Sequence, residues 1–411
     1  MNQKINIKSI MKFVRQRDFW NKQTESWSSV EDILNDSEVI LSPSKLKFVT
    51  SGNITMSEDL ITKLVLRKIN SIICNIYKVK QSNRNYITQD LKTLLHDDTP
   101  VFIIKTDIHS FYESIKNKKL LDKLSREKIV SFEIIEYLKK MISYESVGLP
   151  RGLNISASLS ELYMRDFDTK IMIMDSVGYF ARYVDDIIIL FYTNENLSID
   201  SAEKELNKMI LIIKKELAKL DLAINTKKTN GFYIPSKGNF YTFNYSNKSK
   251  GCFVKQKYSS NNEICFDYLG YRYKLGINHK PSLGIAKNKI NKIKSRIYNS
   301  FLLYKYDNNF RKLEIRIKYL FTNHLIYEND SDKLYGGIYY NYSQCDSDGK
   351  FLESIECFYS KTLKIFKCNL NTEQYNKLKK LSITAGYKKR IIETFSYSNI
   401  QEILSGIKHY E

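Results

Sequence analysis

The spacing of apolar residues predicts helices in the first hundred residues. Apolar side chains recur every three or four positions in residues 5–17 and again in residues 57–77, where a Ser and a Glu stand at the start. A shorter helix is predicted for residues 87–95. The polar, basic stretch KVKQSNRN is therefore expected to be a loop between the second and third of these helices.

From residue 101 the apolar pattern mixes strands with helices. Residues 101–108, VFIIKTDI, form an apolar run that ends in an acid, which is typical of a buried strand. Helical spacing returns in residues 111–124 and 131–142. A loop that contains Gly and Pro then leads into a long helix within residues 148–174.

A second strand signal follows this long helix. Residues 178–192, GYFARYVDDIIILFY, are typical of two strands joined by a tight turn, and residues 201–220 of an amphipathic helix. Helices that pack on a sheet with acids at one end indicate an α+β fold. After residue 273 the spacing is mostly helical, over residues 285–304, 309–326 and 351–366.

Two adjacent acids, Asp185 and Asp186, stand directly before a strongly strand-forming run. Adjacent carboxylates repel each other and Asp is a poor strand residue, so another interaction must offset this cost. A hairpin turn would place both acids at one end of the sheet, and Asp107 would join them if its strand is the neighbour. Clustered carboxylates suit Mg²⁺, and two such ions can activate a hydroxyl for phosphoryl transfer. The alternative is a polar turn, because Tyr-x-Asp-Asp alone is a weak signal.

Five segments between about residues 66 and 273 resemble, in order, the motifs of reverse transcriptases. IIKTDIHSFYESI is similar to the first palm motif, and GLPRGLNISASLSELYMRDFD to the loop and helix that contact template and nucleotide. YVDD resembles the catalytic hairpin, LAINTKKTNGF the segment after it, and FDYLGYRY the primer-grip hairpin. The resemblance implies a right-hand polymerase with fingers and an RRM-like palm, in which an antiparallel sheet packs on helices.

The same resemblance sets the expected domain limits. Residues 1–50 would be an N-terminal extension and residues 51–276 the fingers and palm. Residues 277–335 would form a helical thumb, and residues 336–411 a helical C-terminal region.

The resemblance also implies roles for the acids and for one lysine. The metal set would be Asp107, Ile108, Asp185 and Asp186, of which Asp107 and Asp185 would bind both Mg²⁺ ions, or alternatively Mn²⁺. Asp186 would be catalytic and close to the ions, with less direct contact. Lys228 would protonate the departing pyrophosphate, unless it is simply one more lysine of a lysine-rich chain.

Nucleotide contacts are expected around the first palm motif. Tyr112, with Phe111 beside it, matches the steric gate whose ring leaves no room for a 2′-hydroxyl, so that DNA is the expected product; alternatively the ring packs under a helix. Arg151 falls where many reverse transcriptases have Gln, and with Gly152 it would contact the nucleotide.

The remaining expected contacts lie in the basic loop and the last motif. Arg84 would grip the triphosphate, while Leu269 and Gly270 would form the primer grip. Equally basic alternatives to Arg84 are Arg67, Lys78 and Lys80.

The details are similar to bacterial abortive-infection and defence-associated reverse transcriptases. This branch implies antiphage defence, an associated noncoding RNA as template, dNTP substrates and a DNA product. The alternatives are a retron-type enzyme, an untemplated DNA polymerase of the same branch, an RNA-dependent RNA polymerase, and a catalytically silent RNA-binding scaffold. A protein partner or a homo-oligomer also fits.

Charge and cysteine usage agree with this resemblance. The 65 Lys and Arg against 45 Asp and Glu give a net charge of +20, which favours a polyanionic partner, although an A/T-biased coding sequence would also be lysine-rich. The six cysteines form no Cys-x-x-Cys pair, which indicates reduced thiols. No stretch approaches the roughly 20 apolar residues of a membrane span, and no signal peptide is evident, so we expect a cytoplasmic bacterial protein without membrane contact.

Overall fold

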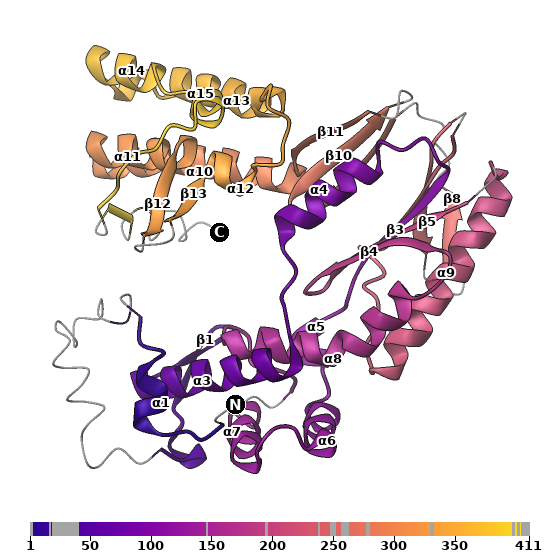
Figure 1. Cartoon of the computed structure of the whole chain (residues 1–411). Coiled ribbons are helices and arrows are strands. Elements are labelled where there is room, and N and C mark those ends of the chain that lie inside the picture. Colours follow the sequence, from indigo (N-terminus) through magenta and orange to yellow (C-terminus); the bar gives the residue numbers. More distant parts are fainter. Residues whose placement is uncertain are drawn as a thin grey trace. The chain divides into compact units, whose positions relative to one another are not determined.

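The computed structural model describes residues 3–15, 18, 41–144, 147–193, 196–236, 239–246, 252–255, 263–276, 280–328, 333–396, 399–400 and 403. The chain packs as two compact units (Figure 1). The first unit comprises Met1–Asn83 and Thr99–Ser260, and the second comprises Arg84–Asp98 and Asn261–Glu411. The expected limits of fingers, palm and thumb at residues 50, 276 and 335 stay predictions.

A six-stranded antiparallel sheet forms the centre of the first unit, with the strand order β4-β5-β3-β6-β7-β8. Its strands are β3 (Val101–Asp107), β4 (Val177–Tyr183), β5 (Asp186–Tyr192), β6 (Asn230–Ile234), β7 (Tyr241–Ser246) and β8 (Cys252–Lys255). Four successive residues of β5, from Ile187 to Leu190, have no exposed surface. Because successive side chains of a strand point to opposite faces, both faces of β5 are covered.

Helices pack on this sheet, as the α+β prediction requires. The long helix α8 (Asn154–Met172) contacts β4, and α9 (Ile199–Lys219) contacts β3 and β8 (Figure 1). The buried residues of α9 recur at helical spacing, which confirms the predicted amphipathic helix. They are Ala202, Leu206, Ile210, Ile213 and Leu217.

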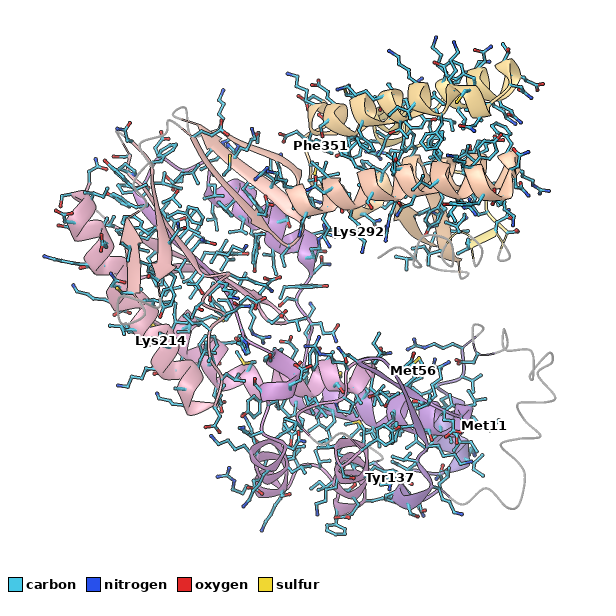
Figure 2. The ribbon with its side chains drawn as sticks, turned by 180° about the vertical axis from the view of Figure 1, so that it is seen from behind. Met11, Met56, Tyr137, Lys214, Lys292 and Phe351 are labelled. Carbon is cyan, nitrogen blue, oxygen red and sulfur yellow. The ribbon has the colours of Figure 1, made fainter. Side chains whose placement is uncertain are left out.

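The other helices of the first unit extend its core away from the sheet. Helix α3 (Leu60–Tyr77) packs on α8, and α1 (Ile7–Met11) packs on α3. Helices α6 (Asn117–Glu127) and α7 (Phe132–Ile142) pack on each other, and Tyr137 of α7 is buried among the side chains of this unit (Figure 2). The short elements are the hairpin β1 (Phe48–Ser51) and β2 (Ile54–Ser57), the 3₁₀ turn Pro43–Lys45, and α5 (Phe111–Ser114).

The second unit combines a small sheet with helices. Strands β9 (Glu263–Tyr268), β10 (Tyr271–Gly276) and β11 (Pro281–Ile285) pair in the order β11-β10-β9. Phe351 packs against β11 at Gly284 and edge-on against Tyr387 (Figure 2). The remaining elements are α4 (Arg84–Leu94), α10 (Lys287–Asp307), α11 (Phe310–Phe321), β12 (Asn323–Glu328), β13 (Lys333–Gly337), α12 (Ile338–Asn341), α13 (Glu353–Ile365), α14 (Thr372–Lys379) and α15 (Ile383–Lys388), with 3₁₀ turns at Lys350–Leu352 and Lys367–Asn369.

The prediction of one helix over residues 309–326 is wrong at its end. Helix α11 stops at Phe321, the backbone of Thr322 is extended, and residues Asn323–Glu328 form strand β12. The buried Asn323 side chain donates to the carbonyls of Gly386 and Ile391 and accepts from the N–H of Tyr339. These distant partners favour the strand over the helix that local spacing indicates.

Two further boundaries differ from the predictions. Helix α1 covers only Ile7–Met11 of the helix predicted over residues 5–17, and residues 16–17 lie outside the described part of the chain. Arg84 is the first residue of α4 rather than part of a loop. The hairpin predicted around residues 178–192 is confirmed as β4 and β5.

Candidate active site

The strand register brings the three predicted acids to one end of the sheet. Strands β3 and β5 pair with Asp107 opposite Asp186, and Val184 and Asp185 are the two residues between β4 and β5. The N–H of Ile108 donates to the Asp185 carbonyl at 3.0 Å. The turn that carries Asp185 is thus fastened directly to the end of β3.

The backbone of Ile108 faces the same turn. Ile108 lies opposite Ile224 in an isolated antiparallel bridge. The flanking residues form the hydrogen bonds of this bridge: the N–H of His109 donates to the Ala223 carbonyl, and the N–H of Asn225 donates to the Asp107 carbonyl. In such a pair the residue's own N–H and C=O point away from its partner. The Ile108 carbonyl therefore points away from Ile224 and toward the turn that carries Asp185. The predicted contact of this carbonyl with a metal ion requires that direction.

Burial and mutual repulsion make this end of the sheet unfavourable for negative charge. Burial, followed by the charge of Asp107, raises the pKa of Asp185. Burial and the charge of Asp185 raise the pKa of Asp186 to about 6, against the opposing effect of Lys105. A cation at this place would relieve both effects.

Lys228 and Asn225 contact the most buried of the three acids. Asp107 is 5% exposed, and its carboxylate accepts from Lys228 Nζ at 2.7 Å and from Asn225 Nδ2 at 3.1 Å. This ion pair with Asp107 is the main cause of the raised pKa of Lys228. Lys228 therefore holds its proton firmly at the place where the sequence predicts a proton donor.

The donor set fits Mg²⁺ in kind. Among the described residues, no three His, Cys, Asp or Glu side chains are placed to hold a metal ion together. Mg²⁺ does not require such a cage, since proteins usually bind it through one or two carboxylates while water and substrate phosphates supply the other ligands. Asp107, Asp185 and the Ile108 carbonyl meet that smaller requirement.

Tyr112 and Phe111, the two aromatic residues at the predicted steric gate, have different environments. Phe111 is 2% exposed and belongs to the hydrophobic core of the first unit. Tyr112 is only partly buried; burial raises its pKa, and a hydrogen bond with Ser160 of α8 acts in the opposite direction. Gly148 packs on the backbone of Tyr112, because a Cβ at Gly148 would lie 2.1 Å from the Tyr112 carbonyl oxygen.

Arg151 lies beside Tyr112, but its guanidinium is paired with Glu113, an acid to which the motifs assign no role. Arg151 donates through Nε and Nη2 to the two carboxylate oxygens of Glu113, and its guanidinium carbon is 5.8 Å from the centre of the Tyr112 ring. Gly152 has φ +100°, and a Cβ there would lie 2.5 Å from Ile54 Cγ2. The loop that carries Arg151 and Gly152 is therefore packed against β2.

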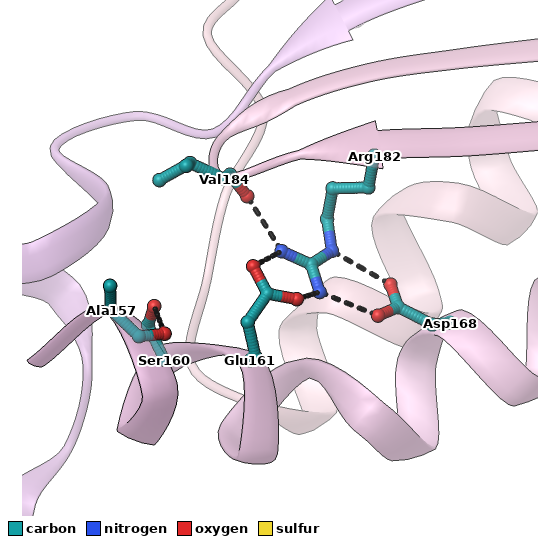
Figure 3. Close-up of polar contacts among 6 residues, drawn as sticks. All are labelled: Ala157, Ser160, Glu161, Asp168, Arg182 and Val184. Carbon is teal, nitrogen blue, oxygen red and sulfur yellow. Dashed lines mark hydrogen bonds and ion pairs between the residues drawn. The ribbon is translucent and has the colours of Figure 1, made fainter. Parts of the chain in front are cut away.

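A buried arginine supports the turn between β4 and β5 (Figure 3). Arg182 is 4% exposed and lies between Glu161 and Asp168 of α8. It also donates to the Val184 carbonyl at 2.8 Å. The sequence interpretation did not include this arginine; the available signal was an Arg inside an apolar strand together with two acids seven residues apart on the preceding helix.

Arg84, Leu269 and Gly270 belong to the second unit, where they contact one another. Arg84 Nε donates to the Leu269 carbonyl at 2.8 Å, and the guanidinium lies over the rings of Tyr271 and Tyr342 at 4.6 and 5.5 Å. Leu269 and Gly270 have φ of +48° and +79° at the turn between β9 and β10. Arg84 thus supports the predicted primer-grip turn, and its expected contact with a triphosphate stays a prediction.

Arg67, one of the alternatives to Arg84, has a different partner. Its guanidinium is buried and donates to both carboxylate oxygens of Asp18 and to the Phe13 carbonyl. Within the described residues, this places Arg67 in the core between α3 and the N-terminal segment.

A sequence profile of the family "Reverse transcriptase (RNA-dependent DNA polymerase)" matches residues 53–273, more than half of the chain. The chain belongs to the reverse transcriptase family. The matched range includes the three acids, Lys228, Tyr112 and the Leu269–Gly270 turn. The α+β architecture is accordingly that of a right-hand polymerase.

Solved structures of telomerase are similar to this reverse transcriptase at low identity. Apo telomerase from Candida tropicalis, truncated from the C-terminal domain, is 13% identical, with a TM-score of 0.34 and coverage of 67% of this chain and 50% of the telomerase chain. Telomerase from Candida albicans in complex with a TWJ fragment of telomeric RNA is 12% identical, with a TM-score of 0.36 and coverage of 84% and 53%. The chain spans about half the length of these telomerases. No curated protein matches it.

In the part of the chain that the structure describes, none of the helices combines the length and the apolar character needed to cross a membrane.

Proposed function

We propose that this reverse transcriptase is an active RNA-directed DNA polymerase that adds deoxynucleotides to a 3′-hydroxyl. The observation that carries the proposal is the register of β3 and β5, which sets Asp107 opposite Asp186 and beside the turn at Asp185. A catalytically silent scaffold has no reason to retain Asp185 and Asp186, because burial and the neighbouring negative charges oppose the ionisation of both.

Asp107, Asp185 and the Ile108 carbonyl would hold the divalent ions, and Asp186 would lie close to the ions with less direct contact. Bound Mg²⁺ would lower the pKa of the attacking hydroxyl and stabilise the charge on the leaving oxygen. The chain's own Lys228 would supply the proton for the leaving group. The 3′-hydroxyl would lose its proton to water as its oxygen bonds to the α-phosphorus and the bond from that phosphorus to pyrophosphate breaks. Lys228 Nζ would give its proton to the departing pyrophosphate and regain one from solvent.

Tyr112 would select the sugar. Gly148 packs on its backbone, its hydroxyl is held by the hydrogen bond with Ser160, and Arg151 lies beside its ring. A fixed ring below the sugar excludes a 2′-hydroxyl by contact rather than by charge, so deoxynucleotides are the proposed substrates.

The biological setting belongs to the same proposal. The resemblance to abortive-infection and defence-associated enzymes supports a role in bacterial antiphage defence, with a noncoding RNA as template. The net charge of +20 supports a nucleic-acid partner.

The test is to purify the protein from its host with any bound RNA, supply labelled dNTPs or rNTPs with Mg²⁺, and sequence both RNA and product. Asp185→Asn is the inactive variant, and Asp175→Asn, at an exposed turn of the same unit, is the matched control. A DNA product that is complementary to one bound RNA, present in the control and absent in Asp185→Asn, supports the proposal.

Other outcomes assign other functions. A homopolymer would indicate untemplated extension, and an RNA product would indicate an RNA polymerase. Bound RNA without any product under these conditions would indicate the scaffold.

A further inference from the structure

The turn that presents Asp185 has a backbone conformation that its sequence does not favour. Val184 has φ +60°, in the left-handed region that β-branched residues rarely adopt. Two-residue hairpin turns normally place Gly, Asn or Asp at such a position. Something outside the turn must therefore hold Val184 in this conformation.

The Arg182 side chain supplies that hold. Nη1 donates to the Val184 carbonyl at 2.8 Å and to Glu161 Oε1 at 3.2 Å. Nη2 donates at 2.6 Å both to Glu161 Oε2 and to Asp168 Oδ2, and Nε donates to Asp168 Oδ1 at 2.8 Å. These five contacts use all five N–H groups of the guanidinium (Figure 3).

The two carboxylates fix the guanidinium from one rigid element. Glu161 and Asp168 are seven residues apart on α8, so they lie on one face, two turns from each other. Four of the five N–H groups satisfy these acids, and the fifth is directed at the turn. A purely structural ion pair would need the four and not the fifth.

We propose that Arg182 is a positioning residue for catalysis: through the Val184 carbonyl it fixes the turn and hence the direction of the Asp185 carboxylate. Helix α8 is then the common support of two parts of the site, because Ser160, the neighbour of Glu161, contacts Tyr112. The inference rests on the proposed function, since it assigns Asp185 to metal binding.

Arg182→Lys tests this role. Lysine keeps the charge between Glu161 and Asp168 but has three donors on one nitrogen and cannot reach both acids and the turn in the planar arrangement of a guanidinium. Arg126→Lys, at an exposed position on α6, is the matched control. The readouts are thermal unfolding, Mn²⁺ affinity by electron paramagnetic resonance, and primer extension as a function of Mg²⁺ and dNTP.

We expect Arg182→Lys to bind Mn²⁺ about 10- to 100-fold more weakly, with a similar rise in the Mg²⁺ needed for half-maximal extension. The KM for dNTP at saturating Mg²⁺ should stay within about twofold, because no nucleotide contact changes. Unchanged Mn²⁺ affinity and Mg²⁺ requirement, with only a lower unfolding temperature, would overturn the proposal.

Val184→Gly provides a second test that does not depend on Arg182→Lys folding. Glycine adopts φ +60° without strain, so the turn becomes free to move even with Arg182 present, and Mn²⁺ affinity should fall. In the double variant the two losses should be less than additive, because both act on the same turn. Fully additive losses would contradict the proposed path from Arg182 to Asp185.

The Mn²⁺ measurement needs no turnover, so it separates the two proposals. Loss of Mn²⁺ affinity in Arg182→Lys together with an inactive wild-type protein would refute the polymerase and leave the positioning role intact. An active wild type with unaltered Mn²⁺ binding in Arg182→Lys would do the reverse.

Discussion

Asp18 anchors the N-terminal segment to α3, and replacing it with Asn should destabilise the first unit strongly. The Asp18 side chain has no exposed surface. It accepts from Arg67 Nη1 and Nη2 at 2.5 and 3.0 Å, from Lys63 at 2.7 Å and from the Arg15 N–H at 2.8 Å. Asn at this position leaves two cations without a counter-charge, and Arg67 is itself buried.

The expected cost is that of breaking a buried pair by removing one partner, roughly 3 kcal/mol or more. For a unit of this size each kcal/mol corresponds to roughly 2 to 4 °C, so Asp18→Asn should lower the unfolding temperature by roughly 6 to 12 °C. Asp166→Asn is the control, since Asp166 is 73% exposed in its pair with Lys123 and should cost roughly 1 kcal/mol at most.

The pH dependence gives an independent check on this reasoning. Burial alone would raise the pKa of Asp18, but the hydrogen bonds from Arg67 and Lys63 outweigh it and hold the pKa well below its ordinary value of 3.8. A lowered pKa means stabilisation that is complete above about pH 4 and is lost as the pH falls further. Thermal unfolding by circular dichroism should therefore show a constant gap between wild type and Asp18→Asn from pH 8 to 5, closing below pH 4. A gap under 2 °C, or one that widens in acid, would refute the argument.

Three further predictions concern the active site. Tyr112→Ala should reduce the preference for dNTP over rNTP by about 100-fold in competition assays, because the ring no longer fills the space of a 2′-hydroxyl; unchanged selectivity would remove the argument for a DNA product. Lys228→Gln should lower kcat by roughly 10²- to 10⁴-fold, because the variant lacks the proton donor. It should also bind Mn²⁺ more tightly, because no ion pair with Lys228 then competes for the Asp107 carboxylate. Lys227→Gln, at the exposed neighbouring position, is the control, and equal effects in both variants would exclude a specific role for Lys228. Asp186 has its pKa raised to about 6, so its carboxylate is protonated below that pH and Mn²⁺ affinity should fall steadily between pH 7 and 5, whereas a flat profile would show that Asp186 does not contribute.

The local pattern predicted the parts of the site that lie on adjacent strands. Asp107 closes an apolar run and Asp185 and Asp186 open another, so the strand ends could be recognised from the apolar runs alone. The pairing of those strands followed from the resemblance to a known family, and the register of β3 with β5 agrees with it.

The parts that the sequence did not predict depend on partners far along the chain. Arg67 looked like a basic residue available for phosphate, but its partner Asp18 is 49 positions away. Strand β12 continues the helical spacing of α11, and its conformation depends on Asn323 bonding to Gly386, 63 positions away. Charge and spacing describe a residue's own tendencies, whereas these outcomes depend on which groups tertiary folding brings beside it.

Two turns with predicted functions share one means of support, and this explains why arginine is used. Val184 and Leu269 both have positive φ, which costs a residue other than glycine on the order of 1–3 kcal/mol, and the carbonyl of each accepts a hydrogen bond from an arginine. Arg182 is fixed by two carboxylates and Arg84 by the rings of Tyr271 and Tyr342, so each guanidinium is immobile before it reaches the turn. Glycine would remove the strain but would also let the turn move. A strained turn that is held by a rigid planar donor has a single conformation. The catalytic carboxylate and the primer contact, each at the end of a sheet, both need a turn that is fixed in this way.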